Sequence, residues 1–192
     1  VPQSRGEPVQ VSRDEHLRAT TYEQLPALPT PFREGGSVTA GNASGVNDGA
    51  AALLIASERA VEAYGMTPLA EITGSASAGV EPRIMGIGPV PAILKICERL
   101  RTPPDGFEIV ELNEAFASQA IACCRELGLD PFDDHINPNG GAIALGHPLG
   151  MTGARIVGTT CLELNVRKAQ SGLVSMCVGV GQGVALSLAF PT

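Results

Sequence analysis

From about residue 66 onward, apolar and polar positions alternate in blocks. Short apolar runs of strand length exchange with longer segments in which apolar residues recur every three or four positions. This alternation is typical of layered α/β proteins with crossover connections. The pattern predicts strands at 69–77, 107–112, 172–177 and 183–190, the last two forming a hairpin, and helices at 58–64, 89–100, 114–127 and from about 150 to 168.

The first 65 residues have a different pattern. Residues 1–36 hold five prolines among several charges and show no sustained apolar period, so we expect them to pack on another part of the protein. Residues 37–65 begin with a turn region rich in glycine and asparagine, continue through an alanine-rich apolar run and end in the short helix. A hinge is expected at 65–68. The chain starts at Val1 rather than at a methionine, which suggests a processed or truncated piece.

Composition excludes several classes of protein. A chain of 192 residues with 44% hydrophobic content can form one good core and part of another. The net charge of -7 makes nucleic acid an unexpected partner. We find no apolar run of membrane-spanning length and no secretory leader. The five cysteines show no metal-ligand spacing and are odd in number, which indicates reduced thiols in the cytoplasm and no metal site.

The glycine-dense run NPNGGAIALGHPLG, residues 137–150, contains a single group capable of acid/base chemistry, His147. Pro148 suits the first turn of a helix, which would place His147 near the N-cap. The helix dipole there disfavours the imidazolium, so the neutral ring can act as a base or a hydrogen-bond donor. A purely structural histidine is the alternative, but a loop this apolar and rich in glycine favours function.

The helix after this loop has one face with almost no side-chain bulk. Glycine inside a helix costs about 1 kcal/mol relative to alanine, so repeated glycines need a packing reason. We therefore predict a helix buried between two layers, with a neighbouring backbone at short distance. The residues of this face are Gly150, Gly153, Ala154, Val157, Gly158 and Cys161.

Two further residues lie at the predicted ends of strands. Cys177 ends LVSMC and precedes GVGQG, where glycines free backbone N–H groups near a thiol that can act as acid or base. A buried cysteine serving as a small hydrophobe is the alternative. Asn113 follows one strand and precedes a helix, where it can cap the helix or orient a water. The remaining cysteines occupy apolar helical positions and are predicted to be core.

Two glycine clusters do not support a nucleotide-binding fold. Gly86 and Gly88 precede a predicted helix, but a third glycine and a downstream acidic residue are not in the required places. The cluster at 179–183 precedes a strand rather than a helix. We therefore do not expect a dinucleotide cofactor.

Four motifs together resemble the thiolases, the acyl-CoA acyltransferases. The motifs are VTAGNASGVNDGAA at 38–51, NEAFA at 113–117, NPNGGAIALGHPLG with the following TGAR, and CVGVGQG at 177–183. The resemblance covers essentially the whole chain in order. It implies a thiolase-like layered αβαβα fold, of which this chain holds mainly the C-terminal mixed-sheet domain at 66–192. Residues 1–36 would be a remnant of the CoA-binding loop region, and 37–65 the closing segment of the N-terminal domain.

The resemblance also implies roles for individual residues. His147 would activate a nucleophilic cysteine and donate a hydrogen bond to the thioester oxygen, and Asn113 would hold the water that completes this oxyanion hole. Cys177 would move the proton on the acetyl α-carbon, and the Gly179 N–H would face the oxyanion of the acyl-enzyme. Coenzyme A would be a co-substrate, with no permanently bound cofactor. The residues implied in binding it are Ser44 and Phe116 at the pantetheine and Arg18 near the adenine.

The family's nucleophilic cysteine belongs to the N-terminal half, and no cysteine here occupies its motif. We therefore expect this chain alone to be inactive, with the missing half as its partner and a dimer or tetramer as the complete assembly. DEHLRATTYEQL and AGVEPRIMGIGPVPA most resemble the branch that cleaves 3-oxoadipyl-CoA in aromatic catabolism. General 3-oxoacyl-CoA and acetoacetyl-CoA thiolases of fatty acid metabolism, and a non-catalytic acyl-CoA-binding subunit, stay open as alternatives.

Overall fold

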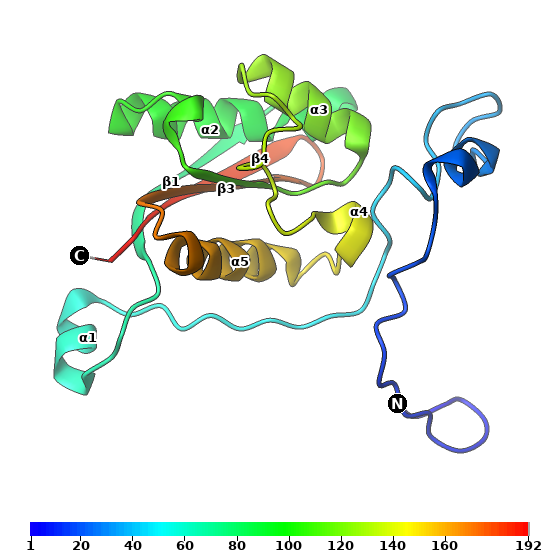
Figure 1. Cartoon of the computed structure of the whole chain (residues 1–192), viewed down its shortest axis with the longest axis horizontal. Coiled ribbons are helices and arrows are strands. Elements are labelled where there is room, and N and C mark those ends of the chain that lie inside the picture. Colours follow the sequence, from blue (N-terminus) through cyan, green and yellow to red (C-terminus); the bar gives the residue numbers. More distant parts are fainter. Residues whose placement is uncertain (192) are drawn as a thin grey trace.

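The computed structural model describes residues 1–191, and regular structure is concentrated after residue 57 (Figure 1). The described part contains no helix long and apolar enough to cross a bilayer. The elements in chain order are η1 (Tyr22–Ala27), α1 (Glu58–Tyr64), β1 (Glu71–Gly79), η2 (Pro82–Ile87), α2 (Pro89–Leu100), η3 (Pro104–Gly106), β2 (Ile109–Leu112), α3 (Ala117–Glu126), α4 (Ala142–Leu145), α5 (Thr152–Arg167), β3 (Ser171–Val178) and β4 (Gln182–Ala189).

The four strands form one mixed sheet in the order β1-β4-β3-β2. β4 is antiparallel to both β1 and β3, and β3 and β4 make the predicted terminal hairpin. β2 is parallel to β3, so the chain between them must cross over, and this crossover contains α3, α4 and α5. The predicted α/β class with a closing hairpin is confirmed.

Helices cover both faces of the sheet (Figure 1). On one face, α2 and α3 pack with the sheet around a core that includes Ile93, Val110 and Leu173. On the opposite face, α5 packs over Ile109 and Leu188. Every residue of β2 is buried, as expected for a strand covered on both sides. The predicted core cysteines are all buried in helices: Cys97 in α2, Cys123 and Cys124 in α3, and Cys161 in α5.

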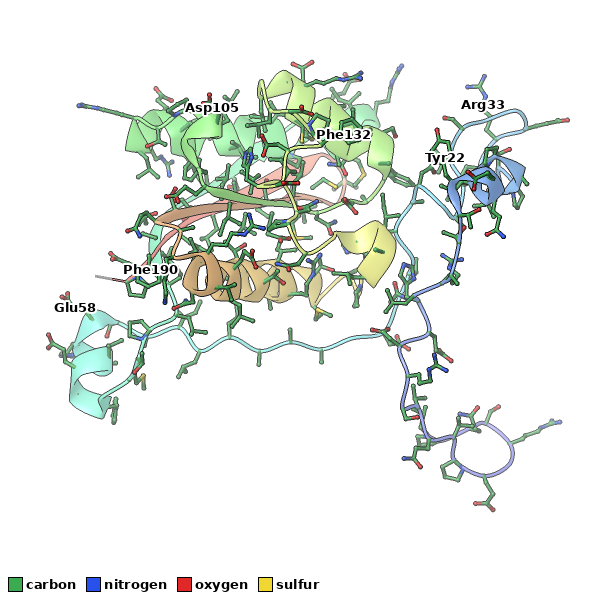
Figure 2. All side chains as sticks on the ribbon, in the orientation of Figure 1. Tyr22, Arg33, Glu58, Asp105, Phe132 and Phe190 are labelled. Carbon is green, nitrogen blue, oxygen red and sulfur yellow. The ribbon has the colours of Figure 1, made fainter. Side chains whose placement is uncertain are left out.

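The first third of the chain does not form a core of its own. None of residues 1–42 is buried, and Figure 2 shows Tyr22 and Arg33 on a segment lying beside the layered body. Residues 46–57 then run extended along the outer side of α5 to α1, which carries Glu58 (Figures 1 and 2). Leu54 is 82% exposed and Ile55 is 73% exposed. As the sequence predicts for residues 1–36, this region does not pack upon itself.

Two helices begin two to three residues later than predicted. α3 begins at Ala117 rather than at residue 114, because the chain before it is extended and bonded to residues 42–44. The Ala117 N–H donates to the Asn42 carbonyl at 2.9 Å, so Asn113 does not cap α3. α5 begins at Thr152, and Pro148 lies in the turn before it, accepting from the N–H of Thr152 at 3.0 Å.

The glycine face of α5 is not in contact with a second backbone within the described residues. A β-carbon on Gly153 would have the Met176 sulfur, at 3.8 Å, as its nearest neighbour, and one on Gly158 would have a methyl group of Leu53 at 3.7 Å. The sheet covers one side of α5 and only the extended segment passes over the other. The predicted close backbone approach occurs instead between Gly88, which precedes α2, and Gly183 in β4.

This contact gives a stability prediction for Gly183→Ala. A β-carbon at Gly183 would overlap the backbone carbonyl of Gly88, and a backbone cannot rotate aside as a side chain can. We expect urea unfolding to show a loss of about 3 kcal/mol, the upper end of overpacking costs. Gly150→Ala is the matched control, because a β-carbon there has nothing within 4 Å. Equal unfolding midpoints for the two variants would contradict the prediction.

Candidate functional site

His147 is delivered to the sheet by the single turn α4 and by Gly146, whose φ of 99° is a conformation that side chains rarely adopt. Its backbone N–H donates to the Oδ1 of Asn47 at 3.0 Å. The buried imidazole contacts two polar side chains. Nδ1 lies 2.7 Å from the Thr152 hydroxyl, and Nε2 lies 3.5 Å from the Asn113 amide nitrogen.

These contacts assign the tautomer of His147. The Thr152 hydroxyl donates its proton to the Pro148 carbonyl at 3.0 Å, so it accepts from Nδ1–H. Nε2 therefore carries the lone pair and faces the Asn113 amide. Burial, and secondarily the positive charge of Arg155, lower the pKa of His147. The site thus holds a neutral imidazole whose Nε2 is a base.

Asn113 extends the β2–β3 ladder by one residue. Its backbone N–H donates to the Ser175 carbonyl in β3 at 2.9 Å, which turns the buried side chain toward His147. Its Oδ1 is buried and has no hydrogen-bond partner among the described residues. Because buried polar atoms are nearly always paired, this oxygen is suited to hold a water or a polar ligand group.

Cys177 lies at the carboxyl end of β3, paired with Gly183 in β4. Burial raises the pKa of its thiol, which is therefore protonated at neutral pH. Gly179 follows in the hairpin loop with open space around it, whereas Gly183 belongs to the β4 ladder rather than to the loop. Since β2 and β3 are parallel, Asn113 and Cys177 lie at the same edge of the sheet, where α/β proteins commonly bind ligands.

The three residues assigned to CoA binding fall into two places. Ser44 bonds the Ala115 carbonyl through its N–H at 3.0 Å and its hydroxyl at 3.2 Å. Residues 43 and 116 form a bridge, so Ser44 and Phe116 lie together beside Asn113. The Phe116 ring is 37% exposed and meets Phe32 edge to face at 6.3 Å. Arg18 lies apart, on the exposed N-terminal segment, with its guanidinium 3.5 Å from the Ala40 carbonyl.

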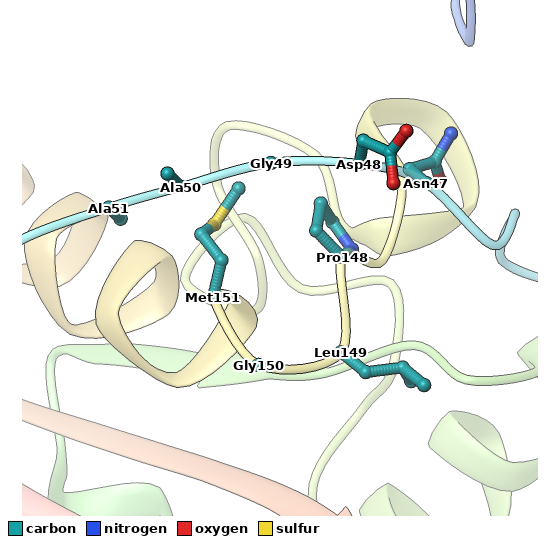
Figure 3. Close-up of a pocket in the computed structure, with 9 residues that line it drawn as sticks. All are labelled: Asn47, Asp48, Gly49, Ala50, Ala51, Pro148, Leu149, Gly150 and Met151. Atoms are coloured by element: carbon teal, nitrogen blue, oxygen red, sulfur yellow. The ribbon is translucent and has the colours of Figure 1, made fainter. Parts of the chain in front are cut away.

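Sequence reasoning missed Asn47 and Thr152 as partners of His147. Asn47 lies a hundred residues away along the chain, in the segment that runs beside Pro148 and Met151 (Figure 3). Together these two segments line a pocket of about 270 Å³. Asn47 belongs to the VTAGNASGVNDGAA motif and Thr152 to the TGAR motif. No local pattern indicates that either side chain contacts His147.

Sequence reasoning also missed a buried ion pair whose cation, Arg155, is close enough to act on the imidazole. Arg155 in α5 contacts Glu111 in β2 at 3.4 Å, and the Glu111 side chain is only 1% exposed. Burial raises the pKa of Glu111 to about 7, with Arg155 opposing the shift and the charges of Glu114 and Glu163 adding to it. Burial likewise lowers the pKa of Arg155. An ionised Glu111 is therefore costly in the folded chain despite its partner.

This pair gives a pH-dependent prediction for Glu111→Gln. The pKa of Glu111 in the folded chain is above the ordinary 4.5, because the fold favours the protonated carboxyl group. The stability that this group contributes is therefore fully present below pH 4.5 and is lost as pH rises through about 7. Glutamine stays neutral, so we expect the variant to gain about 3 kcal/mol over wild type at pH 8 and to match it near pH 4.5. Urea unfolding at both pH values measures this difference. A constant difference between the two proteins across pH would contradict it.

Comparison with known proteins shows the family of this chain. The family model of the thiolase C-terminal domain matches residues 66–189, and that of the thiolase N-terminal domain matches 1–59. The chain is 56% identical over 185 residues to the 3-oxoadipyl-CoA/3-oxo-5,6-dehydrosuberyl-CoA thiolase of Escherichia coli K12, covering 96% of this chain and 46% of the relative. It is 59% identical over 179 residues to a beta-ketoadipyl-CoA thiolase of Pseudomonas aeruginosa, covering 93% and 45%.

A relative from another branch of the family and a solved structure are also similar to this chain. An acetyl-CoA acetyltransferase of Pseudomonas aeruginosa is 50% identical over 190 residues, covering 98% of this chain and 48% of the relative. The crystal structure of human mitochondrial 3-ketoacyl-CoA thiolase in complex with CoA superimposes with a TM-score of 0.89 at 49% identity, covering 94% and 46%. The chain belongs to the thiolase family. It spans about half the length of the curated relatives it matches.

Proposed function

We propose that this chain supplies the C-terminal half of the active site of a thiolase, an acyltransferase that cleaves a 3-oxoacyl-CoA with CoA or runs the reverse Claisen condensation. The observation that carries the proposal is the meeting of the Asn113 and His147 side chains at the sheet edge where Cys177 lies near the end of β3. These are the residues to which the family resemblance assigns the chemistry, and the sequence retains all three.

His147 has the geometry for two successive tasks. Its Nε2 carries the lone pair, so it can take the proton from the nucleophilic thiol supplied by the other half of the enzyme. The resulting Nε2–H then donates a hydrogen bond to the oxygen of the bound thioester. Thr152 keeps Nδ1 protonated throughout and fixes the ring orientation. The lowered pKa of His147 keeps the ring in its basic form at neutral pH.

Asn113 and Cys177 have the other two side-chain roles in the proposed mechanism. The unpaired Oδ1 of Asn113 can accept one proton of a water whose other proton is donated to the same thioester oxygen. When the carbon–carbon bond of a 3-oxoacyl-CoA breaks, the electron pair passes to the acetyl α-carbon, and the Cys177 thiol donates the proton it needs. A raised thiol pKa suits that donation. The Gly179 N–H is assigned to the oxyanion of the acyl-enzyme.

For CoA, we propose that Ser44 and Phe116 contact the pantetheine and that Arg18 lies near the adenine end. The half-exposed Phe116 ring beside Asn113 supports the first part, because an apolar surface next to the reacting groups suits the pantetheine chain. Arg18 is the one cation among these three residues, and it is exposed. The solved human relative was crystallised with CoA. We propose CoA as co-substrate, with no permanently bound cofactor.

The partner of this chain is proposed to be the N-terminal thiolase half, and the complete protein a homo-oligomer. The support is the exposed extended segment 46–57 and the outer side of α5, where small residues have few neighbours within the described chain. We keep the division into 1–36, 37–65 and 66–192, which places a boundary between the two family matches. The five free cysteines support a cytoplasmic location. Alone, the chain is expected to be inactive.

The proposed substrate is 3-oxoadipyl-CoA, cleaved to succinyl-CoA and acetyl-CoA in aromatic catabolism. The names of the relatives at 56% and 59% identity support this choice over a general acetyl-CoA acetyltransferase, whose representative is 50% identical. A substrate series on the complete protein tests it. A higher kcat/KM for 3-oxoadipyl-CoA than for acetoacetyl-CoA is expected, and the reverse order would favour the general enzyme.

A further inference from the structure

Glu114 sits next to Asn113, but its side chain turns away from α3 toward the loop that leads to His147. One carboxylate oxygen accepts from the backbone N–H of Ile143 at 3.2 Å. The other accepts from the side-chain amide of Asn137 at 3.3 Å. A single half-buried carboxylate therefore holds both ends of the loop 137–143.

Asn137, at the start of the loop, is also hydrogen-bonded to the backbone of β2, the edge strand of the sheet. The Asn137 side chain accepts from the Leu112 N–H at 2.8 Å and donates to the Leu112 carbonyl at 2.9 Å, as a neighbouring strand would. Its backbone N–H donates to the Val110 carbonyl at 2.8 Å. Asn137 adopts a positive φ of 45°, which is uncommon for a residue with a side chain. Glu114 thus links this anchored end to the other end of the loop, which leads to His147.

The second end leads directly to His147. Ile143 belongs to the single turn α4, which is followed by Gly146 and the imidazole. Gly141 is required for the contact, because a β-carbon there would overlap the Glu114 carboxylate. Fixing the Ile143 N–H therefore fixes where the chain places His147 relative to Asn113, the residue adjacent to Glu114.

We propose that Glu114 is a positioning residue for His147, tying the loop 137–143 to the end of β2 so that the imidazole is held against Asn113. The importance of that placement for catalysis rests on the proposed thiolase function, whereas the tie itself does not. Asn47, which accepts the His147 N–H, holds the loop from its other side. The residues facing the imidazole are Asn113, Thr152 and, through its charge, Arg155.

The test is an NMR titration and hydrogen exchange of the full 192-residue chain carrying Glu114→Ala. Removing an anion near an imidazole lowers the imidazole pKa, whereas releasing the loop exposes the ring to water and raises it. We expect the pKa of His147 to rise toward its ordinary value, so the sign separates positioning from charge. The Ile143 amide should exchange at least about tenfold faster with solvent. His147→Gln assigns the signal among the three histidines.

Two further variants make the outcome decisive. Glu126→Ala removes an exposed carboxylate from the end of α3 and should change neither readout. Glu114→Gln keeps one acceptor oxygen and should give an intermediate effect, which also carries the test if the alanine variant does not fold. Unchanged titration of His147 and unchanged exchange of Ile143 in a folded Glu114 variant would overturn the proposal. Neither readout depends on acyl-CoA turnover, so an inactive complete protein would contradict the proposed function alone.

Discussion

Replacing His147 with alanine in the complete thiolase is expected to lower kcat for thiolysis by about 10⁴-fold or more. In the proposed mechanism, the variant loses the base that ionises the nucleophile and one donor to the thioester oxygen. An oxyanion donor alone is worth about 10²–10³ in kcat, and general base catalysis about 10²–10⁴. Groups that act in one mechanism are not additive, so the total lies below the product of the two ranges.

Steady-state release of acetyl-CoA measures this loss. KM should change little, because the proposed role of the imidazole is at the reacting atoms rather than on the body of CoA. His135→Ala is the matched control, since His135 pairs with Asp133 away from His147. Thr152→Val should give a smaller loss of kcat, because it removes the partner of Nδ1 but leaves the ring in place. Wild-type turnover in the His147 variant would remove the histidine from the mechanism.

Cys177→Ala is expected to lower kcat by about 10²–10⁴, the range for one positioned acid or base. The loss should be selective. Formation of the acyl-enzyme from an acyl-CoA does not require proton transfer at the α-carbon, so it should persist, whereas exchange of the acetyl α-protons with deuterium from solvent should stop. Comparing the two rates in one preparation separates a chemical role from unfolding.

Cys124→Ala is the control for this variant. Cys124 is a buried thiol of the α2–α3 core and is not assigned to the site, so its removal should cost stability through a small cavity but leave α-proton exchange intact. Continued exchange in Cys177→Ala at the wild-type rate would show that another group moves the proton.

Patterns with local causes were readable from the sequence. The strands and α2 follow from apolar periodicity bounded by proline and glycine, and the β3–β4 hairpin from the glycine cluster between two apolar runs. His147 could be singled out because it is the one acid/base group in a glycine-dense loop. These features depend on neighbours within a few residues, so they can be recognised in the sequence itself.

Features set by distant contacts could not be read in this way. α3 starts a turn late because the chain at 115–117 is bonded to residues 42–44, a contact that competes with helix formation and that no local signal indicates. Asn47 and Glu114 become partners of the histidine loop only through the fold. Thr152 lies only five residues after His147, but its contact with the imidazole depends on the shape of the turn between them. The small-residue face of α5 was predicted to meet a backbone, and in the described residues its glycines have only side-chain neighbours, Met176 of β3 and Leu53 of the extended segment.

We propose that this chain carries the acid/base and oxyanion half of a site whose nucleophile comes from elsewhere. The direct measurement is acetyl-CoA formed from 3-oxoadipyl-CoA and CoA by the purified chain, alone and after assembly with an N-terminal thiolase half that bears the nucleophilic cysteine. We predict no turnover above background for the chain alone and measurable turnover for the assembly, abolished by His147→Ala. Thiolysis by the chain alone would contradict the account.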